Sequence, residues 1–385
     1  MMMLGKREEV VEYFETNAAS KSFITQLLKG PAKQDLSKNK AVKMGSAVDS
    51  MLTQGKKAFD EEYYVTKVVV RDNVREIIDH IFANQDNLFA SQRLKEGTTT
   101  LLENEDLVLD AADMYEYQPT YRAVTRVKNI IGKQGEGEVY FRELKESQGK
   151  TIISEDFMAT VDAVCGSLKT SEVTRELFTA PERGSKIQII YQVPIYWETT
   201  IKGSVVDCKS LLDIVVIDHD KKTVTPVDLK TTGDSLNSFD YVCSKYRYDI
   251  QAAFYTDALY KLVVGEYNAR TTDRLQELFS GIDDYQVVGF KFVVESTQYP
   301  GSPRIYHASH STYKRGKYGQ SRLTSLVDKS LPFQDIAANT PRIVGKDIPG
   351  YIDALENYLW YLENNPEFDC NREYVTNKGV FLLEM

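Results

Sequence analysis

The sequence predicts an α/β fold in which one sheet is flanked by helices. Runs rich in β-branched residues are concentrated at 186–230, and a further strand pair is expected at 285–309. Segments with a helical apolar period come before and after these strands. Because the strands are late and nearly continuous in the chain, we expect a single α/β core with helical additions.

This pattern divides the chain into four parts. Residues 1–56 are expected to form the N-terminal helical part of the core, and 57–185 a helical elaboration of unassigned role. The core that holds the strands is expected at 186–315, followed by a C-terminal helical region at 316–385. The clearest helical patterns lie at 74–88, 155–177 and 348–364.

Two neighbouring strands of the core are expected at 209–217 and 223–230, with the polar cluster 218–222 between them. A two-residue turn at Asp220 and Lys221 would pair positions whose numbers sum to 441. A three-residue loop would instead shift the register by one and move every side chain to the other face. The register is therefore a prediction.

In the 441 register Asp213 lies opposite Asp228, and Lys230 shares the face of Asp228 because strand side chains alternate. Facing carboxylates repel each other and need a shared proton or a cation. Carboxylate oxygens suit Mg²⁺ or Mn²⁺, and a nearby ammonium can orient a water during phosphodiester hydrolysis. The alternative is a surface salt bridge between Asp213 and Lys230. Against it, Asp213 interrupts the apolar run LLDIVVI, where an unpaired charge is costly to bury.

A helix is expected at 248–262, because apolar residues recur there every four positions: Ile250, Phe254, Ala258 and Leu262. Gln251 and Tyr255 are also four apart. They project together from a neighbouring strip, where an amide and a phenol can contact a phosphate or a nucleotide. The alternative is a helix surface with two incidental polar residues.

Together these motifs resemble the PD-(D/E)XK nuclease superfamily, and most nearly its RecB-like and RecE-type phage-recombination exonucleases. Their pattern is an acid ending one strand, D/E-x-K on the next strand and Q-x-x-x-Y on the following helix. This chain supplies each element in order: Asp213, Asp228-Leu229-Lys230, then Gln251 and Tyr255. The last two would lie at the DNA end of the catalytic site.

The resemblance implies a restriction-endonuclease-like core, a central mixed sheet flanked by helices, with helical elaborations. It also implies that Asp213 and Asp228 are metal ligands, that the backbone carbonyl of Leu229 adds a third oxygen, and that Lys230 is the catalytic lysine. The expected cofactor is Mg²⁺, for which Mn²⁺ can substitute.

The N-terminal segments 21–31 (KSFITQLLKGP) and 44–52 (MGSAVDSML) resemble the entry segment of RecE-type exonucleases, where a G-x-x-V/I-H helix follows a serine-rich start. Here Asp49 takes the histidine position. Because that histidine contributes to the family's metal site, Asp49 either substitutes as an oxygen ligand or has lost the role. The alternative is an exposed helix acid facing Lys43 or Lys56.

The strand pair at 285–309 also resembles one in the family. Glu295 lies within it and is expected to be structural, since nothing in the sequence connects it to the metal site.

A net charge of -9 counts against nucleic-acid binding, although a basic groove is needed only where the duplex passes. The candidate DNA contacts are Lys209, Lys245 and Arg247, with Lys202 and a cluster of Lys314, Arg315, Lys317 and Arg322. The alternative for that cluster is a solvated loop.

The cysteines form no C-x-x-C pair, which excludes a zinc-ribbon signature and argues against the iron–sulfur branch of the superfamily. We expect neither zinc, nor an iron–sulfur cluster, nor disulfides. The four cysteines are Cys165, Cys208, Cys243 and Cys370.

No segment is long and apolar enough to span a bilayer, and the start MMMLGKREEV lacks a secretory apolar region. We therefore expect a cytoplasmic protein without a membrane partner, located in the bacterial host cytoplasm if it is phage encoded.

The resulting hypothesis is a phage or prophage DNA exonuclease that acts on double-stranded ends and leaves single-stranded tails for recombination. The resemblance further implies a single-strand annealing protein as partner and a homo-oligomer. Two alternatives remain: an endonuclease of the same superfamily used in restriction or repair, and an inactive nuclease fold that binds DNA or protein.

Overall fold

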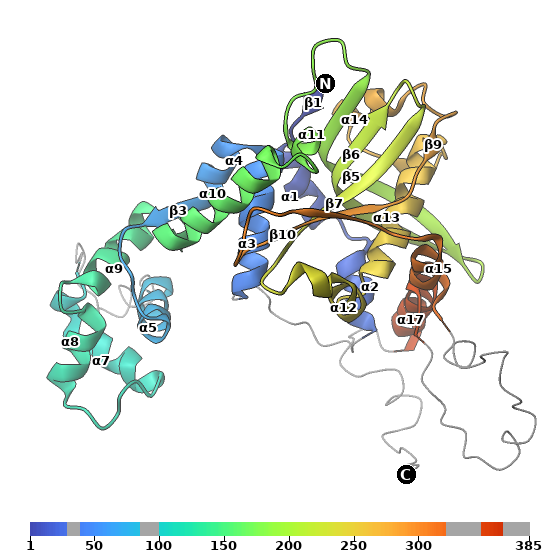
Figure 1. Cartoon of the computed structure of the whole chain (residues 1–385). Helices are drawn as coiled ribbons and strands as arrows, with labels where there is room; N and C mark the ends of the chain where they lie inside the picture. Colours follow the sequence, from blue (N-terminus) through green and yellow to red (C-terminus); the bar gives the residue numbers. More distant parts are fainter. Residues whose placement is uncertain (29–38, 85–99, 321–347, 365–385) are drawn as a thin grey trace, which may run out of the picture. The chain divides into compact units, whose positions relative to one another are not determined.

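The computed structural model of the chain describes four stretches: residues 1–28, 39–84, 100–320 and 348–364 (Figure 1). The contacts divide the chain into two compact units, and each is described by itself. The first, here called the core unit, comprises Met1–Gly55 and Ala163–Met385, and the second, here called the inserted unit, comprises Lys56–Asp162.

The core unit is built on a mixed, curled sheet in which nine described strands take part. Their order is β1-β5-β6-β7-β10-β11, with β2 beside β6, β8 beside β5 and β9 beside β7. The pairs β5–β6, β6–β7 and β10–β11 are antiparallel, whereas β10 runs parallel to β7. The strands are β1 (Met2–Met3), β2 (Ala19–Ser20), β5 (Ile187–Ile201), β6 (Ser204–Asp218), β7 (Thr223–Thr232), β8 (Ala269–Arg270), β9 (Gln286–Val287), β10 (Lys291–Ser296) and β11 (Arg304–His307).

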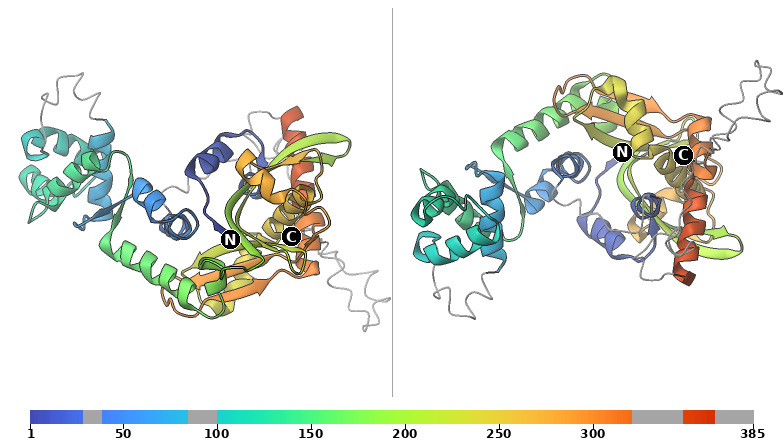
Figure 2. Two further views of the ribbon diagram at one scale, coloured as in Figure 1. Left: turned by 90° about the horizontal axis from the view of Figure 1, so that it is seen from above. Right: turned by 90° about the horizontal axis from the view of Figure 1, so that it is seen from below.

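Helices flank this sheet, as the sequence predicts. Helix α13 packs against β5, β6 and β7, and Figures 1 and 2 show α15 beside α13. No helix among the described residues has the length and apolar character needed to cross a bilayer. The helices are α1 (Arg7–Glu15), α2 (Lys21–Leu27), α3 (Lys40–Asp49), the π-helical turn η1 (Ser50–Gln54), α11 (Arg175–Phe178), η3 (Leu236–Ser238), α12 (Phe239–Lys245), α13 (Tyr248–Val263), α14 (Asp273–Gln276), η4 (Glu277–Phe279), α15 (His310–Tyr318) and α17 (Tyr351–Asn364).

The apolar stripe predicted for 248–262 forms the centre of the core. Its four members are almost completely buried, and the Phe254 ring lies 4.8 Å from the Trp197 ring of β5. Burying one such aromatic or aliphatic side chain stabilises the fold by roughly 1.5–3 kcal/mol. The stripe therefore holds α13, and the polar residues it carries, against the sheet.

The inserted unit is mainly helical and has its own apolar core, which includes Ile77, Val108 and Ile130. Two short strands, which the sequence analysis did not anticipate, pair in parallel as β3 and β4. The elements are α4 (Lys56–Glu62), β3 (Tyr63–Thr66), α5 (Asp72–Ala83), η2 (Leu102–Asn104), α7 (Glu105–Met114), α8 (Ala123–Ile131), α9 (Glu136–Glu146), β4 (Thr151–Ser154) and the start of α10 (Glu155–Thr170).

The helical elaboration expected at 57–185 thus differs from the inserted unit at its C-terminal end. Residues after Asp162 belong to the core unit. The physical reason lies in their contacts: the Ser167 hydroxyl donates to Glu295 of β10, and Leu177 accepts a hydrogen bond from the Tyr191 hydroxyl of β5.

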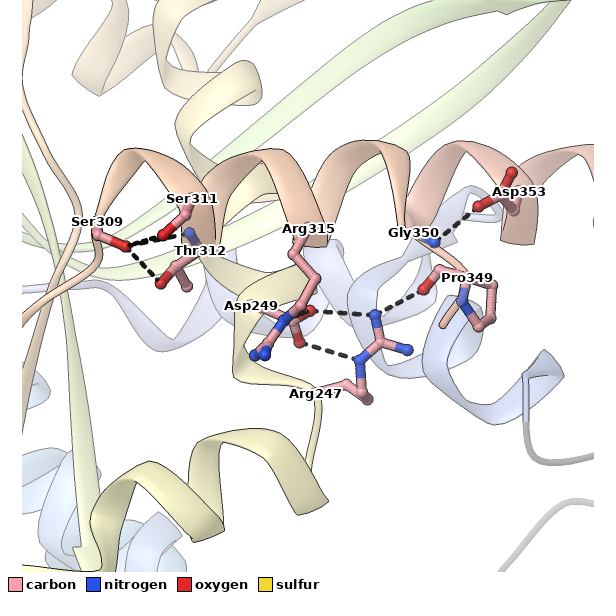
Figure 3. A network of polar contacts seen from close by, with 9 residues as sticks. All are labelled: Arg247, Asp249, Ser309, Ser311, Thr312, Arg315, Pro349, Gly350 and Asp353. Atoms are coloured by element: carbon pink, nitrogen blue, oxygen red, sulfur yellow. Dashed lines mark hydrogen bonds and ion pairs between the residues drawn. The ribbon is translucent and has the colours of Figure 1, made fainter. Parts of the chain in front are cut away.

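A polar network joins α13, α15 and the start of α17 (Figure 3). Asp249, which is 1% exposed, accepts hydrogen bonds from Arg247 at 3.0 and 3.1 Å and from Arg315 at 3.0 Å. Arg247 also donates to the Pro349 carbonyl at 2.6 Å. Since a buried carboxylate needs such partners, the network fixes the three helices relative to one another.

Gly316 of α15 provides a test of this packing. A Cβ at this position would lie 1.9 Å from the Asp249 carbonyl oxygen, so Gly316→Ala is expected to lower the free energy of unfolding by about 1–3 kcal/mol. The control is Gly166→Ala, because a Cβ there meets nothing within 4 Å and alanine is the better helix former by about 1 kcal/mol. Urea unfolding measures both variants. Equal stability of the two would contradict the close approach.

Candidate active site

Strands β6 and β7 form the predicted hairpin in the predicted register. The ladder runs from the Asp218–Thr223 pair to the Ile214–Val227 pair, and each pair sums to 441. The connection, however, is the four-residue segment 219–222, the last residue of which is left-handed with φ 51°. The expected two-residue turn is therefore wrong, while the register it implied is confirmed.

The ladder is interrupted at Asp213 on both sides. Pairing with β7 ends at Ile214, and in the β5–β6 ladder the position that joins Gln192 to Asp213 is skipped, although the register is the same before and after it. Gln192 has φ 51°, a left-handed conformation that is uncommon for residues other than glycine. Strained backbone of this kind persists where the surrounding structure holds it, often at functional sites.

The interruption also changes which side chains face the main core. In β6 the core residues are even-numbered up to Leu212 and odd-numbered from Val215 onward. In β5 the change falls between Ile190 and Val193. Asp213 of β6 and Gln192 of β5 thus lie where the core-facing positions of their strands switch from even to odd numbers. The direction of the Asp213 side chain therefore does not follow the regular alternation of the strand.

Asp213 and the D-x-K residues come together at this point. The Asp213 Oδ2 accepts a hydrogen bond of 2.8 Å from the Leu229 N–H. Asp228 is 1% exposed, and its two oxygens have different partners: the Gln251 amide donates to Oδ1, and the Lys230 ammonium forms an ion pair with Oδ2. The face that Asp228 and Lys230 were predicted to share is confirmed by this ion pair.

Asp49 joins the cluster from the end of α3. Both of its oxygens accept hydrogen bonds from the Gln192 amide, at 3.0 and 2.8 Å, and the same amide lies 3.1 Å from the Thr53 hydroxyl. The alternative of a surface acid facing Lys43 or Lys56 does not fit this placement. Left-handed Gln192 therefore positions an acid from a distant part of the sequence at the same site.

The acids at this site resist ionisation. Burial, together with the like charge of Asp228, raises the pKa of Asp49 to about 7. Burial and the carboxylates of Asp228 and Asp49 raise the pKa of Asp213 well above its usual range. Burial opposes the charge of Lys230, but Asp228 and Asp213 outweigh it and raise the pKa of the ammonium. The site thus holds more acid groups than one lysine can neutralise, and without a further cation some of them keep a proton.

Helix α13 contributes Gln251 and Tyr255, which are 5% and 9% exposed. The incidental-surface alternative is wrong, because the Gln251 amide is committed to Asp228. Burial raises the pKa of Tyr255 well above its usual range, and Tyr13 and the acids of the site add to this effect. The phenol therefore stays protonated.

Two residues of the site were missed by the sequence analysis. Gln192 is the first. The second is Tyr248, three positions before Gln251, whose ring lies 5.0 Å from the Lys230 ammonium and 5.3 Å from the Lys21 ammonium. Helical spacing alone places Tyr248 beside Gln251.

A turn signal in the sequence could have located Gln192. Lys202 and Gly203 stand between two β-rich runs, and both adopt positive φ, as a two-residue hairpin turn of type I′ requires. Such a turn pairs positions that sum to 405, which sets Gln192 opposite Asp213.

Lys209 is not available to DNA, contrary to expectation. It is 7% exposed, and its ammonium donates to the carbonyls of Tyr13, Phe14 and Thr16 at 2.7, 3.3 and 2.7 Å. Burial lowers its pKa. Lys209 instead satisfies carbonyls at the C-terminal end of α1.

Several other candidate DNA contacts are also engaged within the core unit. Arg247 and Arg315 bind Asp249, Lys317 pairs with Asp257 at 2.7 Å, and Lys202 pairs with Glu356 at 2.7 Å. Lys245 and Lys314 are exposed, whereas Arg322 lies outside the described residues. Of the three principal candidates, Lys245 alone presents its charge at the surface.

Glu295 has the structural role expected of it. It is fully buried, and its carboxylate accepts hydrogen bonds from the Ser167 hydroxyl, the Ser296 N–H at 2.7 Å and the Gly301 N–H at 3.2 Å. These contacts hold β10, which lies beside β7.

Comparisons with known proteins find similarity among solved structures alone. No protein-family model matches the chain, and no curated protein matches it. Among solved structures, the chain is similar to the crystal structure of a "putative exonuclease" from Eubacterium rectale, with 12% identity and a TM-score of 0.28 over 91% of this chain and 89% of that chain. A TM-score of this size does not establish a shared fold, so function is inferred from the site itself.

The placement of Lys209 can be tested against that of Lys245. Lys209→Ala should lower the free energy of unfolding by about 1.5–3 kcal/mol, because charge-assisted hydrogen bonds are lost from a buried position. Lys245→Ala should leave stability unchanged. Urea unfolding of both variants measures this difference. Wild-type stability of Lys209→Ala would contradict the buried, structural role of Lys209.

The raised pKa of Asp49 makes stability depend on pH. Between about pH 4 and 7 the folded state keeps a proton that the unfolded state has lost, so the free energy of unfolding should fall as pH rises through this window. We expect a loss of about 1–2 kcal/mol between pH 5 and 7.5 in EDTA. Asp49→Asn should reduce that loss, and the exposed-loop control Asp220→Asn should not. An unchanged pH slope in Asp49→Asn would contradict the placement of Asp49.

Proposed function

We propose that the chain is a divalent-metal-dependent nuclease that hydrolyses phosphodiester bonds of DNA. The observation that carries the proposal is the buried assembly of Asp213, Asp228 and Lys230 around a surplus of negative charge. A binding module has no need to keep two opposed acids beside a lysine, since this arrangement destabilises the folded protein.

The donor set suits Mg²⁺, an ion that water and substrate help to coordinate, and does not form a complete metal site from protein ligands alone. Within the described ranges, no group of three or more acidic, histidine or cysteine side chains converges as ready ligands. Mg²⁺ is commonly held by one or two carboxylates, with waters and substrate phosphate oxygens completing its shell. Asp213 and Asp228 would supply the carboxylates and Leu229 a carbonyl oxygen. Asp49, the third acid, would serve as a further oxygen donor.

When bound, Mg²⁺ would supply Lewis acidity and a water of lowered pKa. The residues of the chain perform the remaining work. Lys230, held by Asp228 and by the Tyr248 ring, would orient the attacking water and offset negative charge on the phosphate. The Gln251 amide would keep Asp228 in position, since it donates to the oxygen that Lys230 leaves free.

The substrate that we propose is the double-stranded DNA end, with digestion of one strand leaving a single-stranded tail for recombination. This part rests on the resemblance of the motifs to RecE-type exonucleases. A phage or prophage origin, a single-strand annealing partner and a homo-oligomer belong to the same proposal.

The deciding experiment compares linear duplex DNA, labelled separately at the 5′ and 3′ ends, with a closed circular plasmid in Mg²⁺, Mn²⁺ and EDTA. Metal-dependent loss of the linear DNA with the circle intact is the expected result, and the labels give the polarity. A cut circle would indicate an endonuclease. Absence of cleavage in both metals would favour an inactive binding module.

Lys230→Ala should lower the cleavage rate by about 10²–10³-fold, because the group that orients the water and offsets developing charge is lost. Binding of DNA in EDTA should remain largely intact. Lys221→Ala is the matched control, since it removes an exposed lysine of the β6–β7 connection and should leave the cleavage rate unchanged. Equal cleavage rates for wild type and Lys230→Ala would overturn the mechanism.

Asp213→Asn should weaken Mg²⁺ binding as well as cleavage, since it removes a charged oxygen ligand. A Mg²⁺ titration of the cleavage rate, beside calorimetric titration of Mg²⁺ without DNA, measures both effects. An unchanged Mg²⁺ dependence would remove Asp213 from the ligand set.

A further inference from the structure

A series of aromatic rings leads from the proposed catalytic lysine to the surface at the junction of α12 and α13. The Tyr248 ring, whose centre lies 5.0 Å from the Lys230 ammonium, is nearly parallel to two other rings. They belong to Phe292, at 5.6 Å and 26°, and to Tyr246, at 6.0 Å and 26°. Phe292 is 2% exposed, whereas Tyr246 is 43% exposed. A single ring therefore separates Lys230 from an aromatic side chain that is open to solvent.

The backbone that carries Tyr246 is held firmly on both sides. Tyr246 ends α12, where its N–H donates to the Val242 carbonyl at 3.0 Å. The next residue, Arg247, has φ 54°, and its guanidinium is fixed by Asp249, at 3.0 and 3.1 Å, and by the Pro349 carbonyl, at 2.6 Å (Figure 3). A ring held in place before binding loses less entropy when a ligand stacks on it.

Lysine ammonium groups lie beside the same rings. Lys245 is exposed, and its ammonium lies 5.3 Å from the centre of the Tyr246 ring. Lys21, at the start of α2, lies 5.3 Å from the centre of the Tyr248 ring. These are two ammonium groups in addition to that of Lys230, in a chain whose net charge is -9. The local charge therefore favours an anionic ligand at this junction.

A second exposed ring lies on the same helix. Tyr241 is 66% exposed and stands four positions before Lys245, so the two side chains share one face of α12. Proteins that bind single-stranded nucleic acid without sequence preference combine these two kinds of side chain. Their aromatic rings stack on unpaired bases, and their basic residues contact the phosphates.

We propose that Tyr246 stacks on an unpaired base of the DNA strand at the catalytic site and that Lys245 binds a phosphate of the same strand. The ligand is single-stranded DNA of any sequence, since every base has a π-face. This inference rests on the proposed nuclease function, because the strand has to reach Lys230. It goes further by assigning a contact for the bases, which the metal site does not provide.

Binding of a short single strand to the full chain in EDTA tests the proposal without any requirement for cleavage. The probe is a strand of about 12 nucleotides in which thymine alternates with 2-aminopurine, a fluorescent base whose emission falls when it stacks on another ring. We expect the wild-type chain to bind this strand and to quench the 2-aminopurine emission. The affinity should fall as salt is raised, because phosphate contacts release counterions.

Variants separate the contributions of the ring and the ammonium. Tyr246→Leu keeps an apolar contact with Tyr248 but removes the aromatic face, so it should weaken binding about tenfold and remove most of the quench. Tyr246→Phe keeps the face and should retain both. Lys245→Ala should leave the quench at saturation and reduce the slope of log K against log salt by about 0.7, the value for one phosphate of a single strand.

Tyr267→Ala is the matched control. It removes a tyrosine that is 98% exposed beyond the C-terminal end of α13, whereas Tyr246 precedes the start of that helix, which is about 24 Å long. Affinity and quench should both be unchanged in this variant.

Wild-type affinity and quench in Tyr246→Leu, or a wild-type chain that does not bind the strand, would overturn the proposal and leave the exposed face of α12 for a protein partner. The outcome is separate from that of the cleavage assay. Quenching that depends on Tyr246 in a chain that cleaves nothing would refute the nuclease and support the stacking site. Metal-dependent cleavage without such quenching would do the reverse.

Discussion

The ion pair between Lys230 and Asp228 is the interaction on which the site depends. It lies beside two further acids, Asp213 and Asp49, whose pKa values are raised by burial and by the neighbouring carboxylates. In an apolar interior one ammonium cannot neutralise three carboxylates, so the site either holds protons or recruits a cation. The same surplus of acid groups that weakens the folded protein supports the metal-dependent hydrolysis proposed above.

The backbone around the site is shaped to bring those acids together. A regular β6 would send the Asp213 side chain to one face in strict alternation, but both β5 and β6 change face where Gln192 adopts φ 51°. The Gln192 amide then holds Asp49, which reaches the site from the end of α3. Local strain in one residue thus connects segments that are about 140 positions apart in the chain.

Helix α13 links the acidic cluster around Lys230 to the rest of the core unit. One strip of the helix is buried against β5 through Phe254, another carries Gln251 to Asp228, and Asp249 at its start binds two arginines. The arginines Arg247 and Arg315 were expected to contact DNA and instead stabilise this helix. The sequence alone does not show whether a charged side chain is exposed or forms an ion pair with a buried acid.

Much of the fold and part of the site could be predicted from the sequence, because they depend on local patterns. The apolar period of 248–262 determined the face that α13 buries, and the β-rich runs with their polar connection determined the register that sets Asp213 near Asp228. Only the tertiary structure decided which charges remain free. Lys209 is buried against the C-terminal end of α1, and Gln192 holds Asp49 at the site. Each of these placements depends on contacts between residues far apart in the chain. Local periodicity carries no information about such contacts.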